Sequence, residues 1–318
     1  MIGKDLLQLR GMPRETIATI LDTADQMREV GRRRVKKVPP LRGRLVVTLF
    51  FENSTRTKTS FELAAKRLSA DTLSFSVSTS STTKGETLMD TARTIFAMQP
   101  DAVVVRHGCA GAPHLLARNF GWHVLNAGDG IHEHPSQGLL DMLTIRDRLG
   151  SLDGARVAIV GDVQHSRVAR SNIWGLTTMG ARVLVAGPGT MCRAELAGLP
   201  VEMRHTIDDV VRDADVIMLL RIQHERLGRG VLPSPREYAS FYGLDLARLK
   251  AAGPNVMVMH PGPINRGVEI SADVADSAQS VILDQVTNGI AVRMALLYLL
   301  LGSDGAPETA GGTSHAAD

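Results

Sequence analysis

Cysteine is scarce in this sequence, and long apolar runs are missing. Cys109 and Cys192 are the only cysteines among 318 residues, and neither lies at metal-binding spacing from a second cysteine. The pair supports neither a zinc site nor a disulfide framework, and it favours a reducing compartment such as the cytoplasm. No apolar run reaches the roughly 18 residues that a membrane span needs. Lys4 and Asp5 lie where a secretory leader would be apolar. We therefore expect no membrane association and no leader.

A strong charge of one sign is also missing. The 36 Lys and Arg residues are nearly balanced by 33 Asp and Glu residues, which leaves a formal net charge of +3. The basic run at residues 32–37 is short enough to be the solvated end of a helix, so we expect no nucleic-acid partner. The chain exceeds the roughly 250 to 300 residues at which single cores stop growing, so two domains are expected.

Short apolar runs alternate with helical spacing along the chain. Residues 45–51, 73–77 and 102–105 are typical of buried parallel strands, and helical periodicity follows each run. After a predicted helix at 135–149, the alternation resumes, with predicted strands at 157–160, 183–186, 216–220 and 256–259. We predict an α/β protein with two similar-sized three-layer domains, each with a mostly parallel sheet, bridged by helices.

The first domain is expected over residues 1–134, completed by a C-terminal helix at 286–302, and the second over residues 135–285. The apolar run that contains this last helix also holds Asp284, Asn288 and Arg293, which argue against a membrane span. Residues 303–318 are rich in Gly, Ala, Thr and Ser, and we expect a disordered tail there.

Residues suited to binding an anion follow the first predicted strand. Ser54, Thr55, Arg56 and Thr57 lie between that strand and its helix. Backbone N–H groups and the positive end of the helix dipole favour an anion there, and the side chains add further donors. A simple helix cap with a surface arginine is the alternative.

Two further features of the first half have similar chemistry. The loop at 80–86 offers the hydroxyl of Ser80 and the ammonium of Lys84 to a negatively charged ligand, although an ordinary surface loop has the same composition. Arg106 directly follows the third predicted strand, and ligands of parallel α/β sheets gather outside the carboxyl ends of strands.

The string at residues 132–137 contains two histidines and a glutamate. Pro135 places His134 just before a helix and breaks the spacing of a helical zinc motif, so we expect no metal. We interpret His134 as a hydrogen-bond donor to a ligand, with Gln137 one turn inside the helix. A capping role for the histidine is the alternative.

Candidate residues of the second half also lie at predicted strand ends. Residues 160–162 lack the Gly-x-Gly-x-x-Gly spacing of a dinucleotide site, so no nicotinamide cofactor is expected. Arg167 opens the next helix, and Arg221 and Gln223 follow a later strand. A guanidinium fork there suits a carboxylate.

Pro261, Gly262 and Pro263 form a rigid turn whose carbonyl groups can face a ligand, with a purely structural turn as the alternative. The candidate set over both halves contains no nucleophile with a paired base. Positioning and charge stabilisation are therefore the expected mechanism.

These strings, in this order, resemble the aspartate/ornithine carbamoyltransferase family over nearly the whole chain up to Gly302. Residues 54–57 resemble the family's carbamoyl-phosphate signature, and residues 134–137 resemble its His-Pro-x-Gln motif. Residues 80–86, 221–223 and 260–263 are similar to the aspartate-specific branch, because the ornithine branch carries a His-Cys-Leu-Pro string at the last position.

The resemblance implies a role for each candidate residue. Carbamoyl phosphate would be bound by Ser54, Thr55, Arg56, Thr57, Ser80, Arg106, His134, Gln137, Pro261, Gly262 and Pro263. L-Aspartate would be bound by Lys84, Arg167, Arg221 and Gln223. The catalytic residues would be Thr55, Arg56, Lys84, Arg106 and His134, of which Thr55, Arg106 and His134 would donate to the carbamoyl oxygen.

The resemblance also implies a reaction and an assembly. The chain would transfer the carbamoyl group of carbamoyl phosphate to the amino group of L-aspartate, giving N-carbamoyl-L-aspartate and phosphate in de novo pyrimidine (UMP) biosynthesis, without metal or cofactor. Alternatives are a carbamoyltransferase for another amino acid such as ornithine, or a non-catalytic assembly subunit. Ser80 and Lys84 would reach into a neighbouring subunit's site in a homotrimer, which is compatible with a larger assembly with dihydroorotase or regulatory chains.

Overall fold

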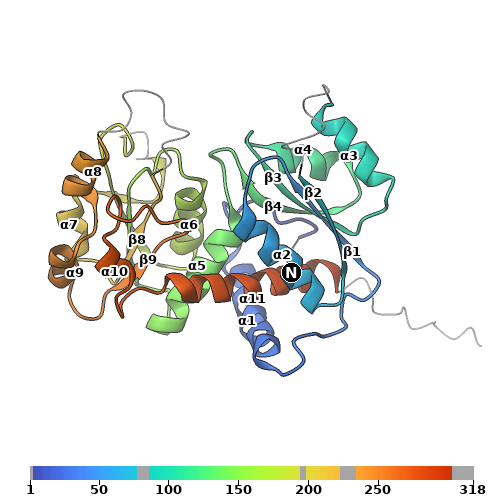
Figure 1. Ribbon diagram of the computed structural model, residues 1–318, viewed down its shortest axis with the longest axis horizontal. Helices are drawn as coiled ribbons and strands as arrows, with labels where there is room; N and C mark the ends of the chain where they lie inside the picture. The colour runs from blue at the N-terminus through green and yellow to red at the C-terminus, as the bar shows by residue number, and fades with distance from the viewer. Residues whose placement is uncertain (1–2, 77–85, 194–197, 223–233, 303–318) are drawn as a thin grey trace, which may run out of the picture.

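The structure is a computed structural model that describes residues 3–76, 86–193, 198–222 and 234–302. Two lobes lie side by side, each built around its own parallel sheet with helices packed on it (Figure 1). The predicted fold of two α/β domains with parallel sheets flanked by helices is confirmed. The expected tail at 303–318 lies outside the described residues.

The first sheet has four parallel strands in the order β2 (Asp71–Ser76), β1 (Leu45–Phe50), β3 (Ala102–His107), β4 (His123–Asp129). Alternate residues face opposite layers, as strand geometry requires. Val46 and Val104 pack with α1 (Arg14–Arg32) and α2 (Thr55–Arg67). Val47 and Val103 pack with α3 (Leu88–Phe96) and α4 (Ala112–Asn119). The sheet is therefore buried on both faces.

The second sheet has five parallel strands, in the order β7 (Glu202–Met203), β6 (Arg182–Ala186), β5 (Arg156–Val160), β8 (Val216–Leu219), β9 (Met257–Met259). On one face Val157 and Met218 pack with α6 (Arg167–Thr178). On the other face Val160 and Leu219 pack with α7 (Ile207–Val211), α9 (Leu246–Ala252) and α10 (Ala272–Ala275). α8 (Pro235–Tyr242) lies beyond this layer and packs through Tyr238 with Ile222.

Two long helices join the lobes (Figure 1). α5 (Pro135–Leu149) is buried from Pro135 to Ile145 and contacts α6 of the second lobe as well as β4 of the first. α11 (Ile282–Leu301) contacts β9 at one side and α1 and α2 at the other. One apolar cluster therefore contains residues from both sheets. Among the described residues, no helix is long and apolar enough to cross a membrane.

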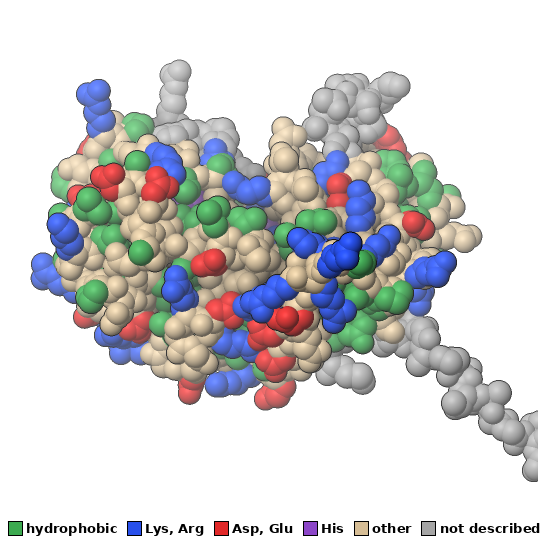
Figure 2. Space-filling model, turned by 60° about the horizontal axis from the view of Figure 1, so that its bottom comes forward, with side chains coloured by type: hydrophobic (Ala, Val, Ile, Leu, Met, Phe, Trp, Pro, Cys, Tyr) green, Lys and Arg blue, Asp and Glu red, His purple; other side chains and the backbone are tan. Residues whose placement is uncertain are grey.

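Acidic and basic side chains are interspersed on the surface that Figure 2 presents. Across α1 and α5, Arg146 pairs with Asp22 at 2.6 Å and with Asp25 at 2.5 Å, and Arg28 pairs with Asp147 at 2.9 Å. These pairs join the N-terminal helix to the bridging helix. Their mixed signs agree with the small net charge.

Some elements were not expected from the sequence, namely β4, β7, α8, α9 and α10. β4 was missed because Asn126 interrupts its apolar pattern. The Asn126 amide is nevertheless buried, and it donates to Leu7 O at 2.8 Å and to Asp129 Oδ1 at 2.7 Å. The backbone of Leu6 also forms hydrogen bonds with this strand. Its N–H donates to Val124 O, and its carbonyl oxygen accepts from the N–H of Asn126. The segment at Leu6 and Leu7 thus provides hydrogen-bond partners for the buried polar residue inside the strand.

Candidate active site

Those predicted site residues that the structure describes lie at the carboxyl ends of strands in both sheets and at the N-termini of α2, α5 and α6. This is the edge where parallel α/β sheets bind ligands, and helix N-termini there favour anions. Of the predicted residues, Ser80, Lys84 and Gln223 lie outside the described residues. The others are described, and the contacts below bring most of them together.

Helix α2 begins earlier than the sequence suggested, at Thr55. Thr55, Arg56 and Thr57 occupy its first turn instead of the preceding loop, and Ser54 is the N-cap residue. The Ser54 side chain makes no capping hydrogen bond, so the simple capping alternative does not describe it. The N–H groups of a first helical turn have no intrahelical acceptor. This turn therefore offers backbone donors together with hydroxyl groups.

Glu52 lies between two of the predicted arginines. Its Oε2 is 2.7 Å from an Arg167 terminal nitrogen and 3.4 Å from Arg106 Nε. Arg106 also donates to Ala127 O at 3.1 Å. A Cβ added at Gly128 would lie 2.9 Å from Arg167 Nε, so only glycine allows the guanidinium to approach the backbone so closely. One carboxylate thus holds an arginine from each domain.

A second pair of arginines meets at the turn after β9. A Cβ built on Gly262 would lie 2.8 Å from a terminal nitrogen of Arg56, so the guanidinium from the first domain lies against a turn of the second. Burial lowers the pKa of Arg56, and the positive charge of Arg221 lowers it further. Arg221 therefore lies near enough to repel Arg56. An anion between them would relieve that repulsion.

His134 is buried at the start of α5. Its backbone N–H donates to Ser171 Oγ at 2.9 Å, and its Nδ1 lies 3.5 Å from Ser136 Oγ. Burial lowers the pKa of His134 well below its ordinary value, and the positive charges of Arg106 and Arg167 act in the same direction. The imidazole is therefore neutral at neutral pH, with one N–H donor and one acceptor nitrogen.

Gln137 is oriented by a buried carboxylate. Its Nε2 donates to Asp141 Oδ1 at 2.9 Å, which leaves the amide oxygen as the acceptor on its other side. Asn172 and Gln285 also donate to Asp141, at 2.8 and 2.7 Å. Burial raises the pKa of Asp141 to about 6, although these hydrogen bonds favour its charged form.

His260 holds the proline turn in place. Its Nδ1 accepts from the N–H of Gly262 at 2.7 Å, so the ring proton lies on Nε2, which donates to Glu269 Oε1 at 3.1 Å. Gln285 Oε1 accepts from the backbone N–H of His260 at 3.0 Å. Since Gln285 also donates to Asp141, one side chain links the turn to the carboxylate that orients Gln137.

Several residues of this network were not predicted, namely Glu52, Asp141, Ser171, Gln285 and Arg293. The positive charge of Arg293 also lowers the pKa of His134. Glu52 directly follows a predicted strand, and that position was its one signal in the sequence. The others are polar residues inside helices, buried with exposed fractions of 0 to 4%. A polar residue at an apolar helical position can indicate a buried network, but the sequence does not identify its partners.

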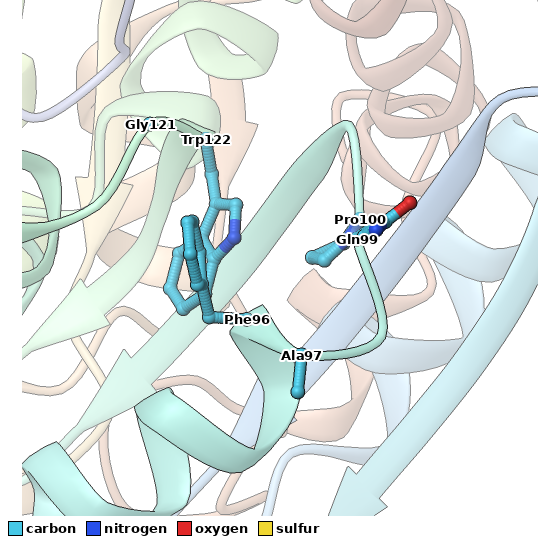
Figure 3. Close-up of a pocket in the computed structure, with 6 residues that line it drawn as sticks. All are labelled: Phe96, Ala97, Gln99, Pro100, Gly121 and Trp122. Atoms are coloured by element: carbon cyan, nitrogen blue, oxygen red, sulfur yellow. The ribbon is translucent and has the colours of Figure 1, made fainter.

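A surface pocket of about 420 Å³ lies elsewhere on the first domain. It is lined by Phe96, Ala97, Gln99, Pro100, Gly121 and Trp122 (Figure 3). Pro100 and Trp122 precede β3 and β4. The pocket is therefore at the amino edge of the sheet, away from the arginines at the carboxyl edge, and it takes no part in the candidate site.

Comparisons with known proteins agree with this arrangement. A family model for the carbamoyl-P binding domain of aspartate/ornithine carbamoyltransferase matches residues 4–147. A second model, for the Asp/Orn binding domain of aspartate/ornithine carbamoyltransferase, matches residues 153–300. The aspartate carbamoyltransferase catalytic subunit of Pelotomaculum thermopropionicum is 58% identical over 302 residues, which are 95% of this chain and 98% of that protein. The corresponding subunit of Geobacter sulfurreducens is 58% identical over 306 residues, 96% of this chain and 98% of that protein.

Solved structures show the same fold. Aspartate transcarbamoylase from Trypanosoma cruzi, in complex with carbamoyl phosphate and aspartate, has a TM-score of 0.83 and 31% identity, and the match covers 93% of this chain and 96% of that one. Ornithine carbamoyltransferase from Pyrococcus furiosus also has a TM-score of 0.83 and 31% identity, with 94% and 97% covered. Fold similarity alone therefore does not separate the two amino-acid substrates.

Proposed function

The chain belongs to the aspartate/ornithine carbamoyltransferase family, and we propose that it acts on aspartate. It transfers the carbamoyl group of carbamoyl phosphate to the amino group of L-aspartate, which gives N-carbamoyl-L-aspartate and phosphate. The observation that carries this assignment is the 58% identity, over nearly the full length of both chains, to catalytic subunits named for aspartate.

The charges of the site favour aspartate over ornithine. Four arginines gather there, at positions 56, 106, 167 and 221, with Glu52 between two of them. Carbamoyl phosphate and aspartate together bring four negative charges, two on the phosphate and two on the carboxylates. Ornithine has one carboxylate and a second amine, so it would leave one guanidinium without a partner. Leaving such a group unpaired is costly in a water-poor site.

Carbamoyl phosphate would bind mainly to the first domain. Its phosphate would lie at the N-terminus of α2, held by the Ser54 and Thr57 hydroxyls, the Arg56 and Arg106 guanidiniums, and Ser80. The Gln137 amide oxygen is available to accept from the carbamoyl NH2 group, because Asp141 holds the other end of that amide. The carbonyl groups of Pro261, Gly262 and Pro263 would accept from the same NH2 group.

Aspartate would be held by the second domain. Arg167 and Arg221 suit its two carboxylates, and Gln223 would add a further donor. In the described structure Glu52 neutralises Arg167 at 2.7 Å. A substrate carboxylate must compete with Glu52 for that guanidinium. The exchange would couple aspartate binding to a rearrangement between the two domains.

The reaction needs no strong general base from the protein. The aspartate amine attacks the carbamoyl carbon, and negative charge develops on the carbonyl oxygen. Neutral His134, together with Arg106 and Thr55, would donate hydrogen bonds to that oxygen. The bond from carbon to the phosphate oxygen then breaks, and the leaving phosphate accepts the proton that the amine loses. Lys84 would add positive charge that helps to bind aspartate.

We further propose a cytoplasmic homotrimer that serves pyrimidine biosynthesis, on the basis of the family resemblance. In that assembly Ser80 and Lys84 of one subunit complete the site of its neighbour. Assembly with dihydroorotase or regulatory chains is compatible with this arrangement. The domain boundaries at residues 134, 285 and 302 also remain predictions.

Initial-rate assays with carbamoyl phosphate and either aspartate or ornithine test the proposed function. We expect turnover with aspartate and none above background with ornithine, and we expect His134→Ala to lose most of the turnover. A preference for ornithine would reject the substrate assignment. An inactive, folded trimer would support the alternative of a non-catalytic assembly subunit.

A further inference from the structure

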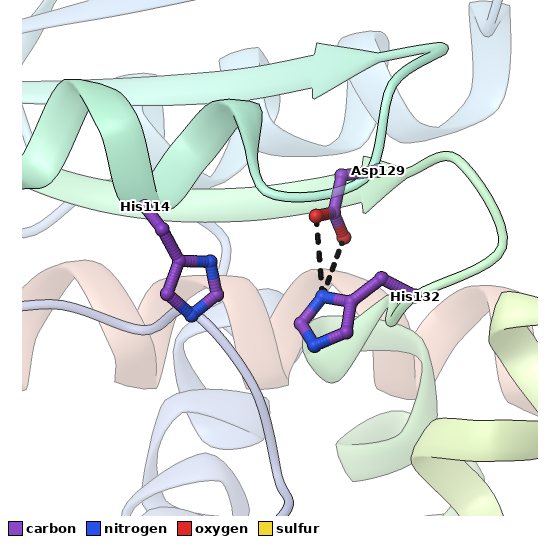
Figure 4. A group of neighbouring side chains, drawn as sticks. All are labelled: His114, Asp129 and His132. Atoms are coloured by element: carbon purple, nitrogen blue, oxygen red, sulfur yellow. Dashed lines mark hydrogen bonds and ion pairs between the residues drawn. The ribbon is translucent and has the colours of Figure 1, made fainter.

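Two imidazoles and one carboxylate meet beside the candidate active site, on its α4 side. His114 comes from α4, Asp129 ends β4, and His132 lies in the turn before α5. One donor atom from each residue lies within 4.8 Å of the other two. Figure 4 shows the three side chains gathered around one space. None of the three belongs to the proposed substrate site.

We propose that His114, Asp129 and His132 bind a divalent transition metal ion, with zinc as the best fit. Two imidazoles and one carboxylate are a ligand set that zinc takes in proteins, with a fourth position left for water. The sequence argued against a helical metal motif at residues 132–134. This cluster is different, because it uses neither Glu133 nor His134 and takes two of its ligands from α4 and β4.

The carboxylate is already oriented as a ligand. Asp129 is fully buried, and its oxygens accept from Asn126 Nδ2 at 2.7 Å, from the N–H of Gly111 at 2.7 Å and from the N–H of Glu133 at 3.2 Å. Hydrogen bonds of this kind fix the direction of metal-binding carboxylates. The His132 Nδ1 lies 3.1 Å from both oxygens. A metal ion bound by both residues would lie between this nitrogen and the carboxylate and would replace their hydrogen bond.

His114 provides a second, independent indication. Its Nδ1 is buried and has no hydrogen-bond partner in the structure. Its ring lies edge-on to that of His132, with the ring centroids 5.4 Å apart. A buried imidazole nitrogen without a partner is unusual, and a metal ion would provide one.

The geometry requires a small contraction. Zinc to ligand distances of about 2.0 to 2.2 Å place the ligand atoms of a tetrahedral site about 3.3 to 3.6 Å apart, whereas here they lie within 4.8 Å of one another. The two histidines are only partly buried, so their rings can rotate, and solvent has access to the site. Among nearby charges, Asp5 and Glu133 favour a cation while Arg118 and Arg170 oppose it. We therefore expect micromolar rather than nanomolar affinity.

Bound zinc would fasten α4 and β4 to the turn that leads into α5. That turn ends at His134, so the metal would support the part of the backbone that positions this histidine. The role is structural, and the proposed reaction does not pass through the metal. It follows that zinc should raise the melting temperature of the full chain.

The test uses chelator-treated full-length protein titrated with zinc chloride. We expect one zinc ion per chain, and we expect His114→Gln and His132→Gln each to weaken binding by more than the roughly 10- to 100-fold typical of losing an outer-shell partner. His165→Gln is the matched control. His165 makes the same kind of pair with Asp162, at 2.8 Å and three residues apart, but belongs to no such cluster among the described residues. It should bind zinc like the wild type.

The visible absorption spectrum of bound cobalt, used in place of zinc, tests the metal site on the wild-type chain alone. Cobalt bound by nitrogen and oxygen in a near-tetrahedral site absorbs visible light much more strongly than hydrated cobalt, and we expect that spectrum from the wild-type chain. Circular dichroism checks that the variants are folded. A wild-type chain that binds no zinc at millimolar concentration overturns the proposal. Equal zinc affinity in the wild type, His114→Gln and His132→Gln overturns it too.

Discussion

Gly262 offers a way to move Arg56 without removing its charge. Its φ of +66° is in the left-handed region, and an added Cβ would lie 2.8 Å from an Arg56 terminal nitrogen. Alanine there carries two penalties. The backbone strain is about 1 to 2 kcal/mol, and the guanidinium must move away from the turn. The strain reduces stability, whereas the displacement reduces activity.

Gly267 provides a matched control on the same segment. Its φ is +82°, but an added Cβ would meet nothing within 4 Å. Gly267→Ala therefore carries the backbone strain without the contact. We expect both variants to lose similar unfolding free energy, about 1 to 2 kcal/mol. We expect activity to fall in Gly262→Ala alone.

The size of the activity loss follows from the bond that Arg56 would make to phosphate. A hydrogen bond to a charged group contributes about 1.5 to 3 kcal/mol, which is roughly 10- to 150-fold in kcat/KM for carbamoyl phosphate. Urea unfolding and initial rates measure the two effects separately. Equal activity losses in the two glycine variants would refute the reasoning, because strain alone would then explain both. Full activity in Gly262→Ala would show that the position of Arg56 is unimportant.

Three further predictions concern other parts of the site. Arg221→Ala should lower kcat/KM for aspartate by about 2 to 4 kcal/mol and hardly change the binding of carbamoyl phosphate. Arg56→Ala should weaken the binding of carbamoyl phosphate directly. Equal losses of affinity for both ligands in both variants would reject the assignment of domains to substrates. The pKa of Asp141 is raised from 3.8 to about 6, so between those pH values the folded state holds a proton that the unfolded state has lost. The unfolding free energy of the wild type relative to Asp141→Asn should therefore fall as the pH rises from about 4 to about 6, and level off above. A difference in urea unfolding that stays constant across that range would contradict the shift. Mixing inactive Lys84→Ala subunits with inactive His134→Ala subunits should restore part of the activity if sites are shared in a trimer, and verified mixed trimers without activity would exclude sharing.

The sequence predicted the parts of the fold that depend on local periodicity. The predicted helix at 135–149 is α5, and the apolar runs at 45–51 and 102–105 correspond to β1 and β3. Each has an unbroken pattern over one element. The pattern of β4 is interrupted by buried Asn126, whose side chain donates a hydrogen bond to Leu7 O, 119 residues away in sequence. Periodicity within a segment carries no information about such a partner.

The candidate site shows the same division. Arg106 and Arg167 could be recognised because each lies at the carboxyl edge of a sheet. Arg106 was expected just after the third strand and lies instead among its last two residues, since β3 extends to His107, and Arg167 opens a helix as expected. The carboxylate between them, Glu52, is paired across 115 residues to Arg167. The buried Asp141 and Gln285, 144 residues apart, are linked only by the packing of α5 against α11. Such pairs form only in the folded chain, and no sequence motif indicates them.

The central claim is that one site, assembled from both domains, holds a phosphate beside a dicarboxylate. Calorimetric titration with N-(phosphonacetyl)-L-aspartic acid, which joins both groups in one molecule, tests it directly. We expect one molecule to bind per chain, far more tightly than carbamoyl phosphate or aspartate, because the entropy of bringing two ligands together is already spent in the covalent link. Affinity no higher than that of carbamoyl phosphate alone would show that the two groups do not bind side by side, and would contradict the account.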